Sequence, residues 1–214
     1  MQTPEVFVYL GADRFVPAGN LLNGAAVPGQ DRKFKMAELA AAVLAAAVAD
    51  LQSSGAIALR VVEKKVLFVK TQSVCVDATG AAPEGGFGAA LHAIASRAPG
   101  RSIRDIFRDW LTEDISNPWS WVLMGAFGEA EAQGLIVRDG GTGNKIASGL
   151  FGAIPKASIA PEKRAEVDAG IAAAAAGWEA FKTADAGLAA QLLKACGGAL
   201  SSRKETSATD SADF

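Results

Sequence analysis

The chain has 214 residues, of which 50% are hydrophobic and 21% charged, and its formal net charge is -2. This apolar fraction and the near-neutral charge exclude an intrinsically disordered chain, and the presence of only two cysteines excludes a disulfide scaffold. The chain has no long basic block, which argues against a nucleic-acid binder. Because alanine, the best helix former, is abundant, the composition predicts a helix-rich, soluble, cytoplasmic protein.

The first 35 residues are predicted to form an irregular segment with one short strand. Residues 5–10, EVFVYL, are β-branched and aromatic, which is typical of a strand. Residues 13–35 are rich in Gly, Pro and Asn and have no clear hydrophobic period. The N-terminus has neither the basic region nor the long apolar region of a secretory signal.

An alanine-rich helix over residues 36–54, ended by Gly55, is the next predicted element. Its apolar run contains Glu38 and Asp50 and is mostly Ala, so we expect a buried core helix and not a membrane span. The runs 56–62 and 66–71 then predict a β-hairpin with a charged tip at residues 63–65.

The middle of the chain predicts three helices. A Gly/Pro loop at residues 78–86 precedes the first, over residues 87–97. Ser102 and Asp105 resemble a capping box that starts the second helix. The third runs from Asn117 to Gln133-Gly134.

A second hairpin and two long helices complete the prediction. The hairpin pairs residues 135–137 with 146–151 across a turn at 139–144. One helix begins at Pro161 and runs to about Lys182, and a last one begins after Asp185 and is closed by Gly197-Gly198. Residues 201–214 are polar and are predicted to be a disordered tail.

One pattern occurs twice: a helix, a glycine stop and a hairpin. The first copy begins with the helix over residues 36–54, and the second begins with the helix over residues 119–133. The repeat is either a true duplication or two uses of a common unit, and a winged-helix unit has the same outline. The fold class predicted is mainly α, a single helical domain with two small β-hairpins in winged-helix-like units.

No residue pattern in the chain predicts catalysis. His92 is the only histidine, and Cys75 and Cys196 lie far apart, whereas a zinc site needs three or four such ligands. The chain also lacks a G-x-S-x-G elbow, and the glycine-rich run at 139–145 lacks P-loop spacing. We therefore expect no metal, no cofactor and no enzyme, with a dispersed active site as the least favoured alternative.

Basic and aromatic side chains are the remaining candidates for function. Arg104 and Arg108 share a helix face, beside acidic neighbours. A solvated helix face is the commoner interpretation, and contact with a phosphate or anionic head group is the alternative. Among the tryptophans, Trp110 and Trp121 are expected to be core anchors, and Trp119 is expected to be exposed. The basic clusters are Arg32-Lys33-Lys35, Lys64-Lys65 with Lys70, and Arg101 with Arg104 and Arg108.

The order of these parts resembles the Golgi phosphoprotein 3-like family, which has many bacterial members. The similar stretches are LAAAVLAAAVADLQSSGAIALRV, VDATGAAPEGGFGAALHAI, SIRDIFRDWL, AQGLIV, SGLFGAIPKASIAPEKRAEVDAGI and ADAGLAAQLLKACGGAL, which together cover about residues 36–200. The resemblance is one of pattern and order. It implies a mostly helical domain that binds phosphatidylinositol 4-phosphate at a membrane, with an apolar hairpin tip in the bilayer.

These observations give two hypotheses for function. The first is a peripheral, non-enzymatic protein on the cytoplasmic membrane face that binds anionic lipid head groups. The helix before AQGLIV has no Arg that could bind a head group. The candidate lipid-binding residues of this hypothesis are therefore cations from other segments: Arg32, Lys33, Lys35, Arg138 and Lys145. Its candidate membrane-interface residues are Trp119, Leu135 and Ile136.

The alternative is a winged-helix-like regulatory module or a protein adaptor that binds other proteins through an apolar face, with a homo-oligomer as one form of it. Nucleic-acid binding is not favoured, because the helices before the wings end in VADLQSSG and FGEAEAQG, which are acidic or neutral.

Overall fold

The structure, a computed structural model, describes residues 3–19, 24–66, 69–111, 117–139 and 155–210. It is mainly helical with small antiparallel sheets, as predicted. The described α-helices are α1 (Pro4–Leu10), α2 (Met36–Ser53), α3 (Gly86–Arg97), α4 (Ile103–Trp110), α5 (Pro118–Ala132), α7 (Arg164–Ala184) and α8 (Ala186–Asp210). Two 3-10 turns, η1 (Ala12–Arg14) and η2 (Pro161–Lys163), follow α1 and precede α7.

The described strands form three antiparallel sheets. The first is a short sheet in the order β1-β3-β2, made by β1 (Ala18–Gly19), β2 (Ala25–Ala26) and β3 (Lys33–Phe34). The second has the order β4-β5-β6, from β4 (Ile57–Val66), β5 (Val69–Ala78) and β6 (Arg101–Ser102). The third pairs β7 (Ile136–Arg138) with β8 (Ala157–Ile159).

Helix α2 is the centre of the core, as the alanine-rich run predicts. Its residues from Leu39 to Ala49 are all buried, and it contacts α1, α5, α7 and α8. By length and composition α2 could cross a membrane, with a mean hydropathy of 1.4, but 67% of it is buried inside the protein. The small alanine side chains let these helices and α3 approach α2 closely, which a membrane span does not require.

Residues 5–10 form a helix, and the predicted strand is wrong. Pro4 occupies the first turn of α1, where its fixed φ favours a helix. Every residue from Glu5 to Leu10 is buried, because α1 packs between α2, α5 and α7. A helix makes its backbone hydrogen bonds internally, so it can be surrounded by other helices, and this packing overrides the β propensity of the side chains.

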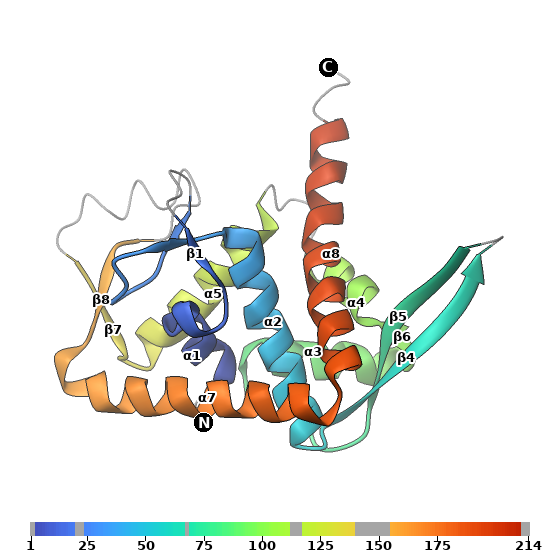
Figure 1. Cartoon of the computed structure of the whole chain (residues 1–214), viewed down its shortest axis with the longest axis horizontal. Helices are drawn as coiled ribbons and strands as arrows, with labels where there is room; N and C mark the ends of the chain where they lie inside the picture. The colour runs from blue at the N-terminus through green and yellow to red at the C-terminus, as the bar shows by residue number, and fades with distance from the viewer. Residues whose placement is uncertain (1–2, 20–23, 67–68, 112–116, 140–154, 211–214) are drawn as a thin grey trace.

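The first hairpin is confirmed, but its tip is not at residues 63–65. Those residues lie within β4, where Glu63 pairs with Gln72 and Lys65 with Lys70. The ladder continues to Val66 opposite Val69, ten residues on each strand. Figure 1 shows this hairpin projecting from the helical body. Glu63 is exposed and still lies within the strand, because a projecting two-stranded ribbon can present a charged residue to solvent.

The second hairpin differs in its partner strand. Strand β7 pairs with β8, with Ile136 opposite Ile159 and Arg138 opposite Ala157. The predicted partner, residues 146–151, and the predicted turn from residue 140 onward lie outside the described residues.

Helix α8 begins as predicted and ends later. Asp185 Oδ1 accepts a hydrogen bond from Leu188 N at 2.8 Å, which is the predicted N-cap. The helix then continues through Gly197 and Gly198 to Asp210, so residues 201–210 extend it, contrary to the predicted stop and disordered tail. A Cβ on Gly197 would lie 4.0 Å from Ala41 Cβ, and one on Gly198 would lie 3.9 Å from Arg104 Nε. The two glycines therefore lie where α8 faces α2 and α4.

Candidate functional site

The predicted lipid-binding residues do not form one site in the described structure. Arg32, Lys33 and Lys35 are exposed just before α2, and Lys35 Nζ pairs with Glu38 Oε1 at 2.7 Å. Lys145 lies outside the described residues. None of the three cavities considered below is lined by any member of the predicted set.

Arg138 already has an anionic partner. Its Nε and Nη2 atoms donate to the two carboxylate oxygens of Glu131, each at 2.6 Å. Its guanidinium also lies 5.4 Å from the centre of the Phe127 ring. The hydrogen bonds to Glu131 raise the pKa of Arg138 and hold it on the helix that precedes its own strand. Arg138 is therefore a poor candidate for binding a second anion.

The predicted membrane-interface residues are mostly inside the protein. Leu135 is fully buried and Ile136 is 3% exposed, so the prediction that they face a membrane is wrong for this structure. Trp119 is half-buried, whereas Trp121, the predicted core anchor, is 39% exposed and packs edge-on against Trp110 at 4.8 Å. The helix turn that precedes β7 directs Leu135 into the core, which sequence spacing did not reveal.

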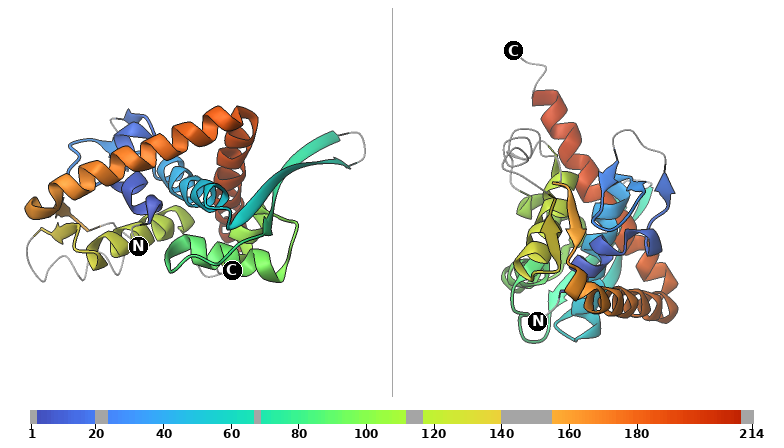
Figure 2. Two further views of the ribbon diagram at one scale, coloured as in Figure 1. Left: turned by 90° about the horizontal axis from the view of Figure 1, so that it is seen from below. Right: turned by 90° about the vertical axis from the view of Figure 1, so that its left-hand side faces the viewer.

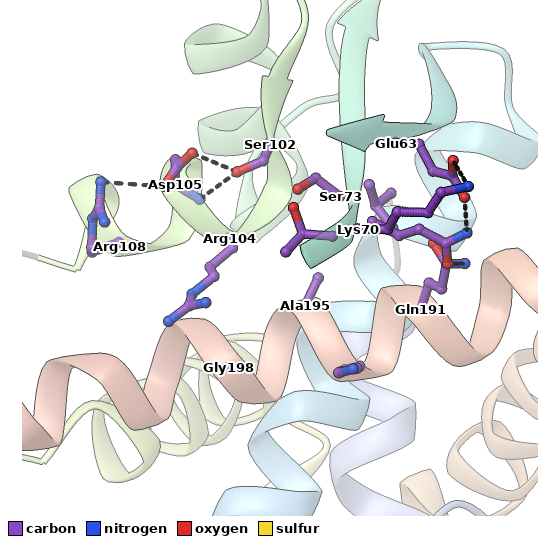
Figure 3. Close-up of a pocket in the computed structure, with 14 residues that line it drawn as sticks. Glu63, Lys70, Ser73, Ser102, Arg104, Asp105, Arg108, Gln191, Ala195 and Gly198 are labelled. Atoms are coloured by element: carbon purple, nitrogen blue, oxygen red, sulfur yellow. Dashed lines mark hydrogen bonds and ion pairs between the residues drawn. The ribbon is translucent and has the colours of Figure 1, made fainter. Parts of the chain in front are cut away.

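The largest cavity that we describe is a groove of about 930 Å³ where β5, α4 and α8 meet. Figure 3 shows α8 along one side, with α4 and the hairpin strands along the other. We call it the α4–α8 groove. Its lining residues are Glu63, Lys70, Thr71, Gln72, Ser73, Val74, Ser102, Arg104, Asp105, Arg108, Gln191, Lys194, Ala195 and Gly198.

The α4–α8 groove is cationic although the chain is not. Its lining has four cations and two carboxylates, a net charge of +2, whereas the whole chain carries -2. Arg108 pairs with Asp105 at 3.2 Å and Lys70 with Glu63 at 3.6 Å. Arg104 and Lys194, the other two cations, form no ion pair with any residue of the described ranges.

Local sequence explains how α4 presents its arginines. Ser102 Oγ accepts from Asp105 N at 3.1 Å, which is the predicted cap and sets the start of the helix. Ile103, Ile106 and Phe107 are buried. Arg104 and Arg108, one turn apart, therefore lie on the opposite, exposed face. Figure 3 shows Arg104 directed toward α8 beside Gly198, where a Cβ would lie 3.9 Å from Arg104 Nε.

Polar side chains complete the groove wall. Gln191 Nε2 on α8 donates to Gln72 Oε1 on β5 at 2.7 Å, and Gln72 Nε2 reaches Glu63 Oε1 at 3.4 Å. Ser73 and Ser102 add hydroxyl groups. Guanidinium, ammonium, hydroxyl and amide donors together suit an oxyanion such as a phosphate.

The basic clusters seen in the sequence include three of the four groove cations, Lys70, Arg104 and Arg108, but the candidate lipid-binding set contains none of them. The position of Arg104 and Arg108 on one helix face was visible from their spacing. Lys194 was missed because it is one surface lysine on a helix that is distant in sequence, and no local pattern links it to α4.

His92, Cys75 and Cys196 have structural environments, as predicted. His92 Nε2 lies 3.0 Å from Gly80 O, and both cysteines are buried. Burial raises the pKa of the Cys196 thiol, which keeps it protonated and unreactive. Within the described residues, no group of three or more His, Cys, Asp or Glu side chains is placed to hold a metal ion.

The fold and groove thus define a class: a mainly helical protein with a projecting hairpin and a cationic groove at its base. Comparison of the chain with protein-family models, curated protein sequences and solved structures found no match.

Proposed function

We propose that the chain is a non-enzymatic peripheral membrane protein that binds anionic, phosphate-bearing lipid head groups through the α4–α8 groove. The observation that carries the proposal is the pair Arg104 and Lys194, two cations from different helices on one groove without an anionic partner among the described residues. Two like charges held on one groove favour a ligand that brings negative charge. The groove replaces the cation set predicted from sequence.

The hairpin beside the groove supports a membrane as the source of the head group. Val66 and Val69 are the last paired residues of the ladder, and Leu67 and Phe68, which join them, lie outside the described residues. The four residues are all apolar by sequence, and lysines 64, 65 and 70 flank them. Apolar residues that enter a bilayer next to lysines at the head-group level are a common arrangement in peripheral proteins.

The resemblance of residues 36–200 to the Golgi phosphoprotein 3-like family belongs to this proposal. It is the reason to name phosphatidylinositol 4-phosphate as the first lipid to test and the cytoplasmic membrane face as the location.

Co-sedimentation with vesicles tests the proposal. We expect retention on phosphatidylcholine vesicles that contain phosphatidylinositol 4-phosphate, and little on phosphatidylcholine alone. Each basic residue near an anionic membrane contributes about 1 kcal/mol, so Arg104→Glu with Lys194→Glu should weaken binding by about 30-fold or more. Arg97→Glu with Arg14→Glu makes the same change in net charge at exposed positions outside the groove and should change binding much less.

Three results separate the alternatives. Equal losses in the groove and control variants would mean diffuse electrostatics and would overturn the groove. A larger loss in a Lys33→Glu, Lys35→Glu, Arg138→Glu variant would favour the cation set predicted from sequence. Absence of retention on every vesicle would overturn membrane binding.

A protein adaptor is the second candidate, and one observation favours it. Trp121 is 39% exposed and forms an aromatic cluster with Trp110 and Phe87, whose ring centres lie 4.8 and 6.3 Å from its own. Exposed tryptophan is enriched at protein interfaces. Trp121→Ala should leave vesicle binding unchanged under the first proposal and should weaken partner binding under the second.

A further inference from the structure

A second cavity, which shares no lining residue with the α4–α8 groove, lies between α1, α2 and α7. Figure 1 shows α7 running below α1 and α2, and the cavity between them has a volume of about 260 Å³. This is below the range of about 300–1,000 Å³ that is usual for drug-sized ligands, so any ligand is small. Its lining has two aromatic residues, Phe7 and Trp178, one carboxylate, Asp50, and otherwise mainly small side chains from α2 and α7.

The aromatic walls of this cavity are held in place. A Cβ added at Gly170 would lie 2.2 Å from Phe7 Cε1, so the backbone of α7 lies directly against the Phe7 ring. Trp178 stacks on Phe181, with ring centres 5.6 Å apart and an interplanar angle of 23°. The cavity therefore has fixed apolar walls, which lowers the entropy lost when a ligand binds.

Asp50, an exposed residue in the last turn of α2, is the carboxylate that lines this cavity. Its side chain forms no ion pair or hydrogen bond with any residue that the structure describes. Partial burial raises the pKa of its carboxyl. A carboxylate beside aromatic rings, with no cation paired to it among the described residues, favours a positively charged ligand.

A neighbouring cavity of about 350 Å³ has two carboxyls besides that of Asp50, those of Glu5 and Glu84. The two cavities share Pro4 and Asp50, and the second is also lined by Glu5, which is 4% exposed. Glu5 Oε1 accepts one hydrogen bond, from Phe87 N at 3.2 Å. No Lys, Arg or His lines either cavity. The charge of Asp50 is thus uncompensated by the residues that line the two cavities.

We propose that the cavity between α1, α2 and α7 binds a small organic cation, an alkylammonium or quaternary ammonium group, with its charge at Asp50 and its apolar body against Trp178 and Phe7. Aromatic faces attract such cations, and a carboxylate supplies the charge pairing. This site is independent of the α4–α8 groove, so its failure would leave the proposed membrane function standing.

Titration with choline, followed by backbone amide chemical shifts of the full chain, tests the proposal. The matched probe is 3,3-dimethyl-1-butanol, which has the same shape without the charge. We expect saturable shifts in α1, α2 and α7 with choline, and binding of the neutral probe at least about tenfold weaker. Equal binding of both probes would overturn the cation site in favour of a merely apolar cavity, and so would the absence of saturable choline binding.

Three variants separate a loss of the site from a loss of folding. Asp50→Asn should lower the affinity for choline to that of the neutral probe. Asp168→Asn, which removes one exposed charge on α7 outside the cavity lining, should leave the preference for choline intact. Ala173→Leu fills the cavity from α7 and should abolish shifts with both probes. If choline binding survives Ala173→Leu, the cation binds elsewhere and the proposal fails.

Discussion

Two regions of the molecule use the same helix ending and then diverge. Helix α2 ends with Ala56 N bonded to Leu51 O at 2.9 Å, around Gly55 with φ +74°. Helix α5 ends with Leu135 N bonded to Ala130 O at 2.9 Å, around Gly134 with φ +67°. Each is a Schellman ending, in which a left-handed glycine turns the chain out of the helix.

The strands that follow have different surroundings. After Gly55 the chain enters a ladder of ten residues on each strand that leaves the body, beside the cationic α4–α8 groove. After Gly134 it enters a three-residue ladder whose first residue, Ile136, is buried, and Arg138 is neutralised by its own helix. A local motif thus sets the turn, whereas the partners of the strand decide whether its surface is available for function. Figure 2 shows the two ladders in separate parts of the molecule.

The largest expected effect is a loss of stability in the second region, where the end of α5 leads into β7 and a buried residue lies close to an exposed one. Leu135→Ala should lower the free energy of unfolding by about 2–5 kcal/mol, because a fully buried leucine leaves a cavity. Val137→Ala, on the same strand but 57% exposed, should change it by no more than about 0.5 kcal/mol. Urea denaturation measures both. Similar values for the two variants would contradict the placement of Leu135 in the core.

The next effect is a dependence of stability on pH near the first region. Glu5 lines a cavity that is also lined by Ser54 and Ala56, at the end of α2. Burial raises the pKa of Glu5 from 4.5 to about 7. Between these values the folded chain keeps a proton that the unfolded chain has released. The contribution of Glu5 to stability is therefore complete below pH 4.5 and falls as pH rises toward 7, by about 3 kcal/mol in all.

Urea denaturation across this pH range, with wild type and Glu5→Gln compared, measures the effect. The variant should lack that part of the decline, while Glu162→Gln, at an exposed carboxyl, should keep the wild-type profile. Parallel profiles for wild type and Glu5→Gln would show that Glu5 titrates normally in the folded protein.

The two glycine stops give a matched pair of smaller effects. Gly55→Ala and Gly134→Ala should each lower stability by about 1 kcal/mol, since an added Cβ meets nothing within 4 Å at either site and only the left-handed backbone is strained. Gly128→Ala, inside α5 and equally open, should instead stabilise by up to about 1 kcal/mol. Thermal denaturation would show whether the two losses are equal, and unequal losses would mean that the two helix endings differ.

The smallest effect tests why the second region has no available cation. Glu131→Gln removes the carboxylate that holds Arg138. Because both side chains are 37% exposed, the loss of stability should stay within about 1 kcal/mol and diminish at high salt. The same variant should slightly raise retention on anionic vesicles, since it frees a guanidinium. A fall in retention would indicate that Glu131 itself supports the binding surface.

Sequence patterns predicted elements whose signals are local. The caps at Ser102 and Asp185 and the stop at Gly55 each depend on residues within one turn, and all three are confirmed. Two other predictions from local signals were wrong, because contacts with distant parts of the chain decide these segments. Residues 5–10 form a helix and not a strand, and α8 continues through Gly197-Gly198. In both cases, packing against other helices outweighs the local preference.

The candidate site divides in the same way. Sequence alone determined a mainly helical chain with an alanine-rich core helix, two glycine-stopped helices that lead into strands, and Arg104 beside Arg108 on one face. Only the tertiary structure decided that α8 brings Lys194 to those arginines, that Arg138 is paired, and that Leu135 is buried. The physical reason is range: hydrogen bonds of caps and turns act within a few residues, whereas burial and charge pairing depend on helices far apart in the chain.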